Sequence, residues 1–266
     1  MTADNIPVNI MGILNVTPDS FSDGGRFTDT ATAVRHAEKM VREGADIIDI
    51  GGESSRPGAV PVPLQEELDR VIPVLEKVAA LDVTVSVDTT KPAVAEKALK
   101  RGAHIVNDIS GLRNGPELAE LAARYNAELV IMHMKGSPGT MQRSPHYGDA
   151  VSEIYGYLEE RMKLAVEAGL PKARIILDPG IGFGKRLEDN IAVFRHLRRF
   201  RNTGCRVMIG ASRKSMIAGI LPAEPDERLP GSLILAAVAV LRGASILRVH
   251  DVGETVQALR VLKSVW

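Results

Sequence analysis

The chain has 266 residues, 45% of them hydrophobic and 25% charged, and its 33 basic and 33 acidic side chains give a formal net charge of zero. These values are ordinary for a globular protein with a sizeable core, and the neutral balance argues against nucleic acid as a partner. The single cysteine, Cys205, excludes an internal disulfide and a multi-cysteine metal site. No apolar stretch approaches the roughly 20 residues of a membrane span, and the first residues lack a signal-peptide pattern, so we expect a cytoplasmic protein without membrane contact.

Short apolar runs alternate with longer amphipathic stretches along the whole chain. Runs of Val, Ile and Leu without alternation are typical of buried parallel strands, and apolar spacings of three and four are typical of helices. The sequence predicts strands near residues 9–14, 46–50, 83–87, 104–107, 128–132, 174–177, 206–210 and 246–249. It predicts a helix after each strand, near residues 30–43, 64–80, 92–101, 115–125, 149–168, 188–200, 231–242 and 253–264.

The joints between helices and strands indicate the fold class. Gly44-Ala45, Gly102-Ala103 and Gly243-Ala244 each precede a predicted strand, and a glycine just past a helix allows a short connection. Eight strand–helix pairs without a linker predict an α/β fold, a (β/α)8 TIM barrel, as a single domain over residues 1–266. An open doubly wound sheet is the alternative, because counting units does not show closure. We expect Pro73 to kink or displace the helix at 64–80.

Acids and amides stand where several apolar runs end, at the rim that carries chemistry in such folds. Asp88, Asn107 and Asp178 each end a predicted strand and offer acceptors to a ligand edge rich in N–H donors, such as a guanidine-like heterocycle. Helix capping or turn formation is the alternative interpretation, and it competes most for Asp178, which precedes Pro179-Gly180. Asp108, next to Asn107, is interpreted as structural.

Cationic side chains and a histidine occupy further strand ends on the same rim, at Arg56, Lys214, Arg248 and His250. Arg248 and His250 alternate along the last strand and so point the same way, while Lys214 leads into a short helix whose backbone N–H groups can meet an anion. We interpret the four as a phosphate or pyrophosphate clamp. Asp251 with Glu254 fits a capping box and is interpreted as structural.

Three long loops follow predicted strands, at 15–29, 51–63 and 133–148, and loops of this length are often functional. Asn15 can bind a hard cation such as Mg2+ together with ligand phosphate oxygens, and Asp23 can reach it from the loop. Ordinary turn formation is the alternative there. The glycine-rich run 178–185 lacks the spacings of phosphate-binding loops, so we interpret it as a tight loop that presents Phe183 to a planar ligand.

Taken together, these residues resemble the dihydropteroate synthase family of the folate pathway, whose members bind pterin. The resemblance covers nearly the whole chain, with its most specific blocks at 15–25, 52–59, 87–89, 107–111, 178–185, 212–215 and 248–251. It implies a (β/α)8 barrel, typically a homodimer, that joins a dihydropterin-methyl pyrophosphate to p-aminobenzoate and releases pyrophosphate.

The resemblance also implies roles for individual residues. The pterin would be bound by Asp88, Asn107, Asp178 and Lys214, in a pocket lined by Ile109, Met132 and Phe183. The pyrophosphate would be held by Asn15, Arg56, Arg248 and His250, with Asn15 and Asp23 near Mg2+. The p-aminobenzoate site would be shaped by Phe21, Ser55, Pro57, Lys214 and Ser215. Catalysis would fall to Asp88, Lys214 and Asp23.

A pyrophosphate leaving group needs positive charge where negative charge develops, and the clamp with Mg2+ supplies it. We therefore expect a largely dissociative substitution, with loops 15–29 and 51–63 closing to exclude water. Three rival functions remain: a methyltransferase using a reduced folate and a corrinoid partner, a non-catalytic pterin sensor, and a Schiff-base aldolase with Lys214 as the amine. The clamp argues against the first, and the intact Asn15, Arg56 and Asp23 argue against the second.

Overall fold

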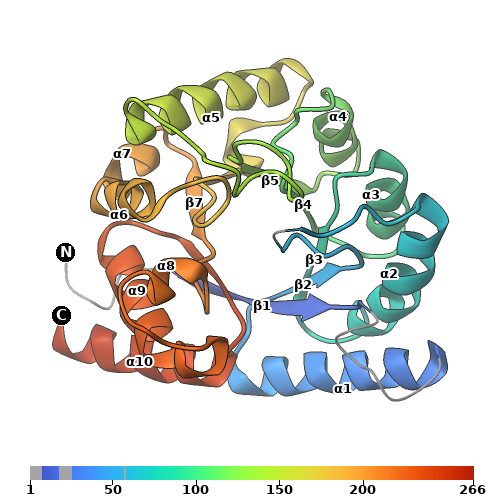
Figure 1. Ribbon diagram of the computed structural model, residues 1–266. Coiled ribbons are helices and arrows are strands. Elements are labelled where there is room, and N and C mark those ends of the chain that lie inside the picture. Colours follow the sequence, from blue (N-terminus) through green and yellow to red (C-terminus); the bar gives the residue numbers. More distant parts are fainter. Residues whose placement is uncertain (1–7, 18–25, 57) are drawn as a thin grey trace.

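A computed structural model describes residues 8–17, 26–56 and 58–266, with the backbone alone at 26–29. Eight parallel strands pair in chain order, and the last pairs with the first, so the sheet is a closed barrel surrounded by helices (Figure 1). The strands are β1 Asn9–Asn15, β2 Ile47–Gly51, β3 Thr84–Asp88, β4 Ile105–Asp108, β5 Glu128–Met132, β6 Ile175–Asp178, β7 Arg206–Ile209 and β8 Ile246–Val249. The predicted TIM barrel is confirmed, and the pairing of β1 with β8 rules out the open sheet.

The helices follow the predicted order with a few differences. They are α1 Arg26–Glu43, α2 Leu64–Val78, α3 Pro92–Leu99, α4 Glu117–Arg124, α5 Ala150–Glu167, α6 Leu187–Arg195, α7 Leu197–Arg201, α8 Ser215–Ala218, α9 Leu229–Leu241 and α10 Val252–Val265. The single helix predicted at 188–200 is two helices, because His196 leaves the helical conformation at φ −113° and ψ 20°. Pro73 lies on the exposed side of α2, which continues past it to Val78.

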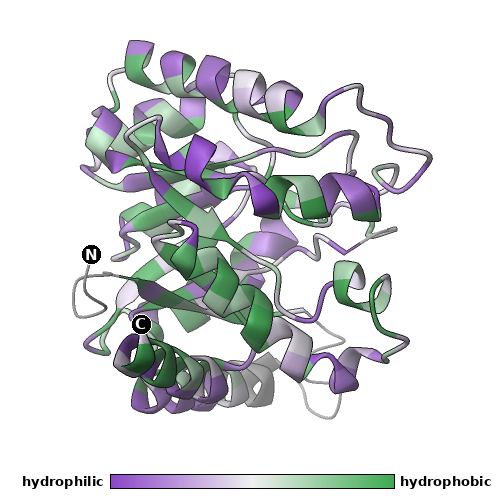
Figure 2. Ribbon diagram, turned by 90° about the vertical axis from the view of Figure 1, so that its left-hand side faces the viewer, coloured by the Kyte–Doolittle hydropathy of each residue, from purple (hydrophilic) through white to green (hydrophobic). Residues whose placement is uncertain are grey.

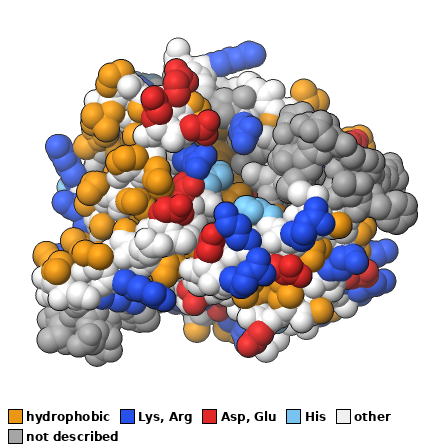
Figure 3. All heavy atoms as spheres, turned by 90° about the horizontal axis from the view of Figure 1, so that it is seen from below, with side chains coloured by type: hydrophobic (Ala, Val, Ile, Leu, Met, Phe, Trp, Pro, Cys, Tyr) orange, Lys and Arg blue, Asp and Glu red, His pale blue; other side chains and the backbone are white. Residues whose placement is uncertain are grey.

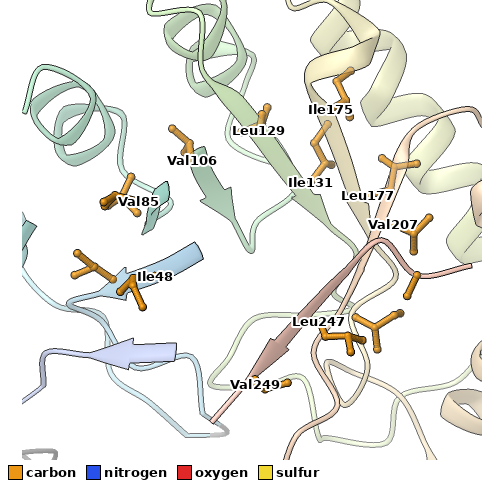
Figure 4. Packing of buried hydrophobic residues seen from close by; sticks show 14 of the residues in the cluster. Ile48, Val85, Val106, Leu129, Ile131, Ile175, Leu177, Val207, Leu247 and Val249 are labelled. Atoms are coloured by element: carbon orange, nitrogen blue, oxygen red, sulfur yellow. The ribbon is translucent and has the colours of Figure 1, made fainter. Parts of the chain in front are cut away.

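Side chains fill the barrel in layers. Its floor is an apolar cluster with one residue from each of seven strands: Met11, Ile47, Ile105, Val130, Ile176, Met208 and Ile246. The intervening residues, among them Ile48, Val106 and Leu177, point outward and pack under the helices (Figure 4). Because side chains alternate along a strand, residues two positions after the floor residues point inward again. That next layer is largely polar, with Asp49, Asn107, Asp178 and Arg248.

The outer surface carries both signs of charge. Figure 3 shows acidic and basic side chains interspersed over one side of the molecule, in keeping with the zero formal net charge. Among the helices of the described segments, none is long and apolar enough to cross a membrane.

Candidate active site

Side chains from four strands meet directly above the apolar floor. Asp49 of β2 accepts hydrogen bonds at Oδ2 from Asn107 Nδ2 of β4, at 3.0 Å, and from Arg248 Nε of β8, at 2.7 Å. Arg248 Nη2 also donates to Asp88 Oδ2 of β3 at 2.7 Å. The Arg248 guanidinium therefore bridges two buried carboxylates. One of them, the fully buried Asp49, is not among the site residues expected from the sequence.

Burial shifts the pKa of two acids here, Asp88 and Asp178. It raises the pKa of Asp88 to about 7, against the opposing effect of Arg248, and neighbouring carboxylates such as Asp49 raise it further. Burial also raises the pKa of Asp178, whose Oδ1 accepts a hydrogen bond from the Gly180 N–H at 2.7 Å. Asp88 can therefore change its charge near neutral pH, and a cation or N–H donor that approaches it favours the ionised form.

Some buried polar atoms of the layer have no hydrogen-bond partner. In the described part of the chain these include Asp49 Oδ1, Ser86 Oγ and Asn107 Oδ1. Ser86 lies opposite Asp49 in the β2–β3 register, so the atoms come from neighbouring strands. A buried acceptor without a partner costs about 1 to 3 kcal/mol, so a ligand that supplies donors here recovers that free energy. The expected ligand edge, rich in N–H groups, matches this pattern.

The apolar residues expected to line the pocket lie in one cluster. Met132 at the end of β5 and Phe183 in the β6–α6 loop pack with Met134 and Met141, and Ile109 packs against the cluster. Phe183 is 8% exposed, which leaves little of its ring in contact with solvent. The structure thus brings together all three of the residues named for this wall from the sequence.

Lys214 links the apolar wall to the acids. Its Nζ lies 4.1 Å from the centroid of the Phe183 ring and donates a hydrogen bond to the Ile181 carbonyl oxygen at 2.5 Å. Burial lowers the pKa of Lys214 to about 7, and the negative charge of Asp178 opposes that shift. Short helix α8 begins at the next residue, Ser215, as predicted, and Ser215 itself is exposed.

The glycine-rich β6–α6 loop is tight, as predicted, and a buried lysine holds it. Gly180 and Gly184 have φ of +69° and +62°, a conformation that favours glycine. The Lys185 amine donates to the carbonyl oxygens of Gly180, at 2.8 Å, and Phe183, at 3.1 Å, and lies 2.9 Å from His133 Nδ1. Burial lowers the pKa of Lys185 to about 7. Lys185 therefore supports the loop that carries Phe183, a role that the sequence did not indicate.

His250 lies at the rim beside the loop that carries Lys214. It is exposed, its Nδ1 is 3.1 Å from Ser212 Oγ, and its backbone N–H donates to the same oxygen at 3.2 Å. Arg213, between Ser212 and Lys214, has a left-handed backbone at φ +57°, and its guanidinium donates to both Asp251 oxygens, at 2.9 Å and 2.5 Å. The capping box predicted at Asp251 is wrong, because this side chain makes no cap hydrogen bond and pairs with Arg213 instead.

The interpretation of Asp108 as structural agrees with its contacts. The side chain is fully buried and accepts hydrogen bonds from the backbone N–H groups of Ser110, at 2.8 Å, and Leu112, at 2.7 Å. It therefore shapes the turn after β4 and leaves the adjacent Asn107 to face the barrel interior.

The β2–α2 loop carries Ser55 and Arg56 at the rim. Ser55 is half-buried and the Arg56 side chain is exposed. Burial lowers the pKa of Lys214 and of His250, and the positive charge of nearby Arg248 lowers both further. The Gly58 N–H donates to the Pro138 carbonyl oxygen at 3.1 Å, which joins this loop to the long loop after β5.

A network under the β2–α2 loop fixes its base. Buried Glu67 of α2 accepts a hydrogen bond from Thr89 Oγ1 at 2.6 Å and pairs with Lys91, which also pairs with Glu53 of the loop. Glu53 in turn accepts a hydrogen bond from the Val62 N–H at 3.1 Å. The base of the β2–α2 loop is therefore held close to Thr89, the residue after Asp88.

Asn15 ends β1 next to Gly51 in the strand register, and Gly51 is next to Asp88. This places Asn15 in the layer of Asp88, at the open end of the barrel. Phe21, Asp23 and Pro57, also expected at the site, lie outside the described residues. Within 8–17, 26–56 and 58–266, no group of three or more His, Cys, Asp or Glu side chains is placed to hold a metal ion.

Comparison with known proteins agrees with this geometry. Residues 11–250 match the family model described as pterin binding enzyme. The dihydropteroate synthase of Escherichia coli strain K12 is 49% identical over 257 residues, which cover 96% of this chain and 91% of that protein.

Solved structures show the same similarity. Dihydropteroate synthase from Xanthomonas albilineans with 4-aminobenzoic acid superposes with a TM-score of 0.92 and 45% identity, covering 100% of this chain and 94% of that one. The same enzyme in complex with 7,8-dihydropteroate gives a TM-score of 0.88 and 43% identity, covering 100% and 95%. With the barrel, the polar layer and these similarities, the chain belongs to the dihydropteroate synthase family, transferases of folate biosynthesis that bind pterin.

Proposed function

We propose that this chain condenses 6-hydroxymethyl-7,8-dihydropterin pyrophosphate with p-aminobenzoate to give 7,8-dihydropteroate and pyrophosphate. The observation that carries this proposal is the buried layer of acceptors inside the barrel, bordered by Phe183 and Lys214. A pterin offers a planar ring with an edge of N–H donors, which matches that combination. The relatives with bound 4-aminobenzoic acid and 7,8-dihydropteroate support the same substrate pair.

In this proposal the deep acids hold the pterin edge. Asp88 and Asp178 accept from its N–H groups together with Asn107, and the raised pKa of Asp88 returns toward ordinary values when a donor binds. The carboxylates then stabilise positive charge that develops on the pterin-methyl carbon. Ile109, Met132 and Phe183 exclude water from the ring faces.

Bond breaking takes place at the rim. The bond between the methyl carbon and the pyrophosphate oxygen breaks with both electrons going to oxygen, and Lys214, Arg248, His250 and Arg56 offset the new negative charge. The amine nitrogen of p-aminobenzoate then bonds to the carbon and gives up a proton to solvent or pyrophosphate. No protein nucleophile is needed. Ser55, Pro57, Phe21 and Ser215 shape the p-aminobenzoate position, with loops 15–29 and 51–63 closing over it.

Magnesium is part of the proposal. The Asn15 side chain provides an oxygen ligand of the kind that Mg2+ prefers, at the open end of the barrel beside Asp88. A cation held mainly by pyrophosphate oxygens needs few protein ligands, so Asn15 with Asp23 fits such a site. When bound, Mg2+ would withdraw charge from the leaving pyrophosphate.

We also infer that the barrel over residues 1–266 works as one pterin-binding domain and that it pairs as a homodimer. Helix α9 has no charged residue, and it packs against α10. The two helices lie on the side of the molecule that faces the viewer in Figure 2. Their exposed large apolar side chains are Ile234, Val261, Val265 and Trp266. Covering this apolar surface with a second copy would remove it from water.

Turnover by purified protein tests the function. The protein is mixed with the pterin pyrophosphate, p-aminobenzoate and Mg2+, and both dihydropteroate and pyrophosphate are measured. We expect equal amounts of the two products, and a loss of at least about 100-fold in kcat/KM for Asp88→Asn, because a charge-assisted contact in a buried site is worth about 3 kcal/mol. Pterin binding without any product would instead favour the sensor function.

Chelation separates the metal proposal from the rest. Addition of EDTA should lower turnover and weaken binding of the pyrophosphate substrate, while binding of 6-hydroxymethylpterin, which has no pyrophosphate, should stay the same. An equal loss for both ligands would contradict a magnesium site at the pyrophosphate end.

A further inference from the structure

Asp49 is the member of the polar layer to which the proposed function gives no role. It is fully buried in the middle of β2, and its Oδ2 contacts two residues proposed to bind substrate, Asn107 and Arg248. Its Oδ1 is buried and has no partner among the described residues. A buried carboxylate with these contacts needs an explanation, because burying a charge is costly unless it is paired.

The contact with Asp49 decides which way the Asn107 carboxamide faces. Asp49 Oδ2 accepts a hydrogen bond from Arg248 Nε at 2.7 Å, so this oxygen presents lone pairs to its other neighbour as well. Asn107 must therefore turn its Nδ2 toward Asp49, at 3.0 Å, and its Oδ1 away from it. Asn107 Oδ1 is one of the buried acceptors without a partner. The carboxamide thus presents an unused acceptor, Oδ1, on the side turned away from Asp49.

Asp49 also fixes Arg248. The guanidinium uses Nε for Asp49 and Nη2 for Asp88, both at 2.7 Å, so two contacts on different nitrogens set its plane. Burial of the pair makes both contacts less screened than they would be at the surface. The positions of Arg248 and Asn107 therefore depend on the same carboxylate oxygen.

We infer that Asp49 is a positioning residue that sets the donor–acceptor pattern of the pterin pocket, by turning the Asn107 oxygen toward the ligand and holding Arg248 against Asp88. This inference rests on the proposed function and extends it to substrate choice. The pocket then selects a pyrimidine ring whose buried edge donates, as the 2-amino group of a pterin does. A ring with an oxygen at that position would place an acceptor against the Asn107 oxygen.

Binding of two ring systems tests this inference. The probes are 6-hydroxymethylpterin and 6-hydroxymethyl-lumazine, in which oxygen replaces the 2-amino group, and their Kd values are measured by titration calorimetry. In Asp49→Asn the amide at position 49 can donate to Asn107 Oδ1, which frees the Asn107 nitrogen to face the ligand. We expect the preference for the pterin to fall by about tenfold, the value of one buried hydrogen bond.

A charge swap is the sharpest arm of the experiment. In the double variant Asp49→Asn with Asn107→Asp, the amide at position 49 donates to a carboxylate at position 107, whose second oxygen again accepts from the ligand. The preference for the pterin should return toward that of the unmodified protein. If Asp49 only stabilised the fold, its replacement would weaken the binding of both ligands equally, and the swap would not restore the ratio of their Kd values.

Asp46→Asn is the matched control. Asp46 stands just before β2, and its Oδ2 accepts from the Ile10 N–H at 2.7 Å, away from the polar layer. The same chemical change there should leave the ratio of Kd values unaltered. If Asp49→Asn binds both ligands with the original preference, or if the swap fails to restore it, Asp49 does not set the pattern. Failure of the proposed condensation would appear separately, as an absence of dihydropteroate when the unmodified protein is given both substrates and Mg2+.

Discussion

Asp88 is the residue whose charge state links the pocket to pH. Its carboxyl is buried, and the Arg248 guanidinium only partly offsets the cost of ionising it, so its pKa stands at about 7. Below that pH the free protein holds a proton at Asp88, and above it the group is a carboxylate. N–H donors of a pterin bind the carboxylate, so binding must release the proton when the pH is low.

We therefore expect pterin affinity to rise between pH 5.5 and 8 and then to level off. The slope should approach about tenfold per pH unit below the pKa, as for release of one proton. Titration calorimetry at several pH values measures it with 6-hydroxymethylpterin. Lys214, with a pKa also lowered to about 7, titrates in the same window, so Asp88→Asn is the necessary comparison. A variant with the same rise as the unmodified protein would assign the proton to another group.

Single residues also show where prediction from sequence succeeds and where it stops. Asp88, Asn107 and Asp178 are recognisable because each ends an apolar run, and the structure places all three in the barrel interior. Asp49 lies in the middle of such a run, where no strand end draws attention to it. An acid inside a buried strand was the available signal, since such a group needs a partner from another strand. That partner, Arg248, is 199 positions away along the chain.

At the scale of elements, the β6–α6 loop shows how closely the backbone must fit. The Cβ of an alanine at Gly180 would lie 1.9 Å from the His133 carbonyl oxygen, and one at Gly184 would lie 2.2 Å from the Lys135 carbonyl oxygen. Both neighbours are backbone atoms at the end of β5 or just after it, so neither can move aside cheaply. The loop that carries Phe183 is thus packed against the segment just after β5, with no room for a side chain at either glycine.

Gly180→Ala should destabilise the protein more than Gly169→Ala. Both glycines have positive φ, at +69° and +93°, so either alanine costs about 1 to 2 kcal/mol of left-handed strain. Only Gly180 adds the clash, because a Cβ at Gly169 meets no atom within 4 Å. Thermal unfolding should show a lower Tm for Gly180→Ala than for Gly169→Ala, together with weaker pterin binding. Equal Tm values would mean that the loop relaxes freely.

The elements themselves were predictable because buried parallel strands have a simple pattern. Every predicted strand is present, and no strand end differs from its predicted position by more than one residue. The prediction of one helix at 188–200 was wrong, because the helix is interrupted at His196 and this residue type gives no indication of a break. The capping box predicted at Asp251 was wrong for a different reason. The local spacing indicated a helix cap, but the side chain of Arg213, from the preceding strand–helix unit of the barrel, binds the Asp251 carboxylate instead. Local patterns cannot register a partner that the tertiary fold supplies.

For the whole molecule, closure of the barrel is what assembles the site, since β2, β3, β4 and β8 contribute to one cluster. Helices α9 and α10 precede and follow β8, the strand that closes the barrel on β1. Both helices leave apolar side chains exposed to solvent. Ile234 is 65% exposed and Val261 is 64% exposed. Such a surface is the basis of the homodimer proposal.

Ile234→Lys should weaken self-association, because a lysine on a covered apolar surface must lose its hydration. Light scattering during size-exclusion chromatography should show a dimer for the unmodified protein and a monomer for the variant. Val166→Lys is the control, since Val166 is 45% exposed on α5, on another part of the ring (Figure 1). A monomeric unmodified protein, or a dimer in both variants, would contradict an interface at α9.

The apolar floor has a kinetic consequence. Met11, Ile47, Ile105 and their neighbours close one end of the barrel, so among the described residues the polar layer is reached from the opposite end. A molecule bound at that entrance blocks passage to the acids below it. The pterin substrate, which binds deeper, has to bind before p-aminobenzoate. The molecules bound near the entrance have to dissociate before another pterin substrate can bind. Steady-state kinetics should then obey an ordered scheme, in which p-aminobenzoate bound early acts as a dead-end inhibitor of its own reaction.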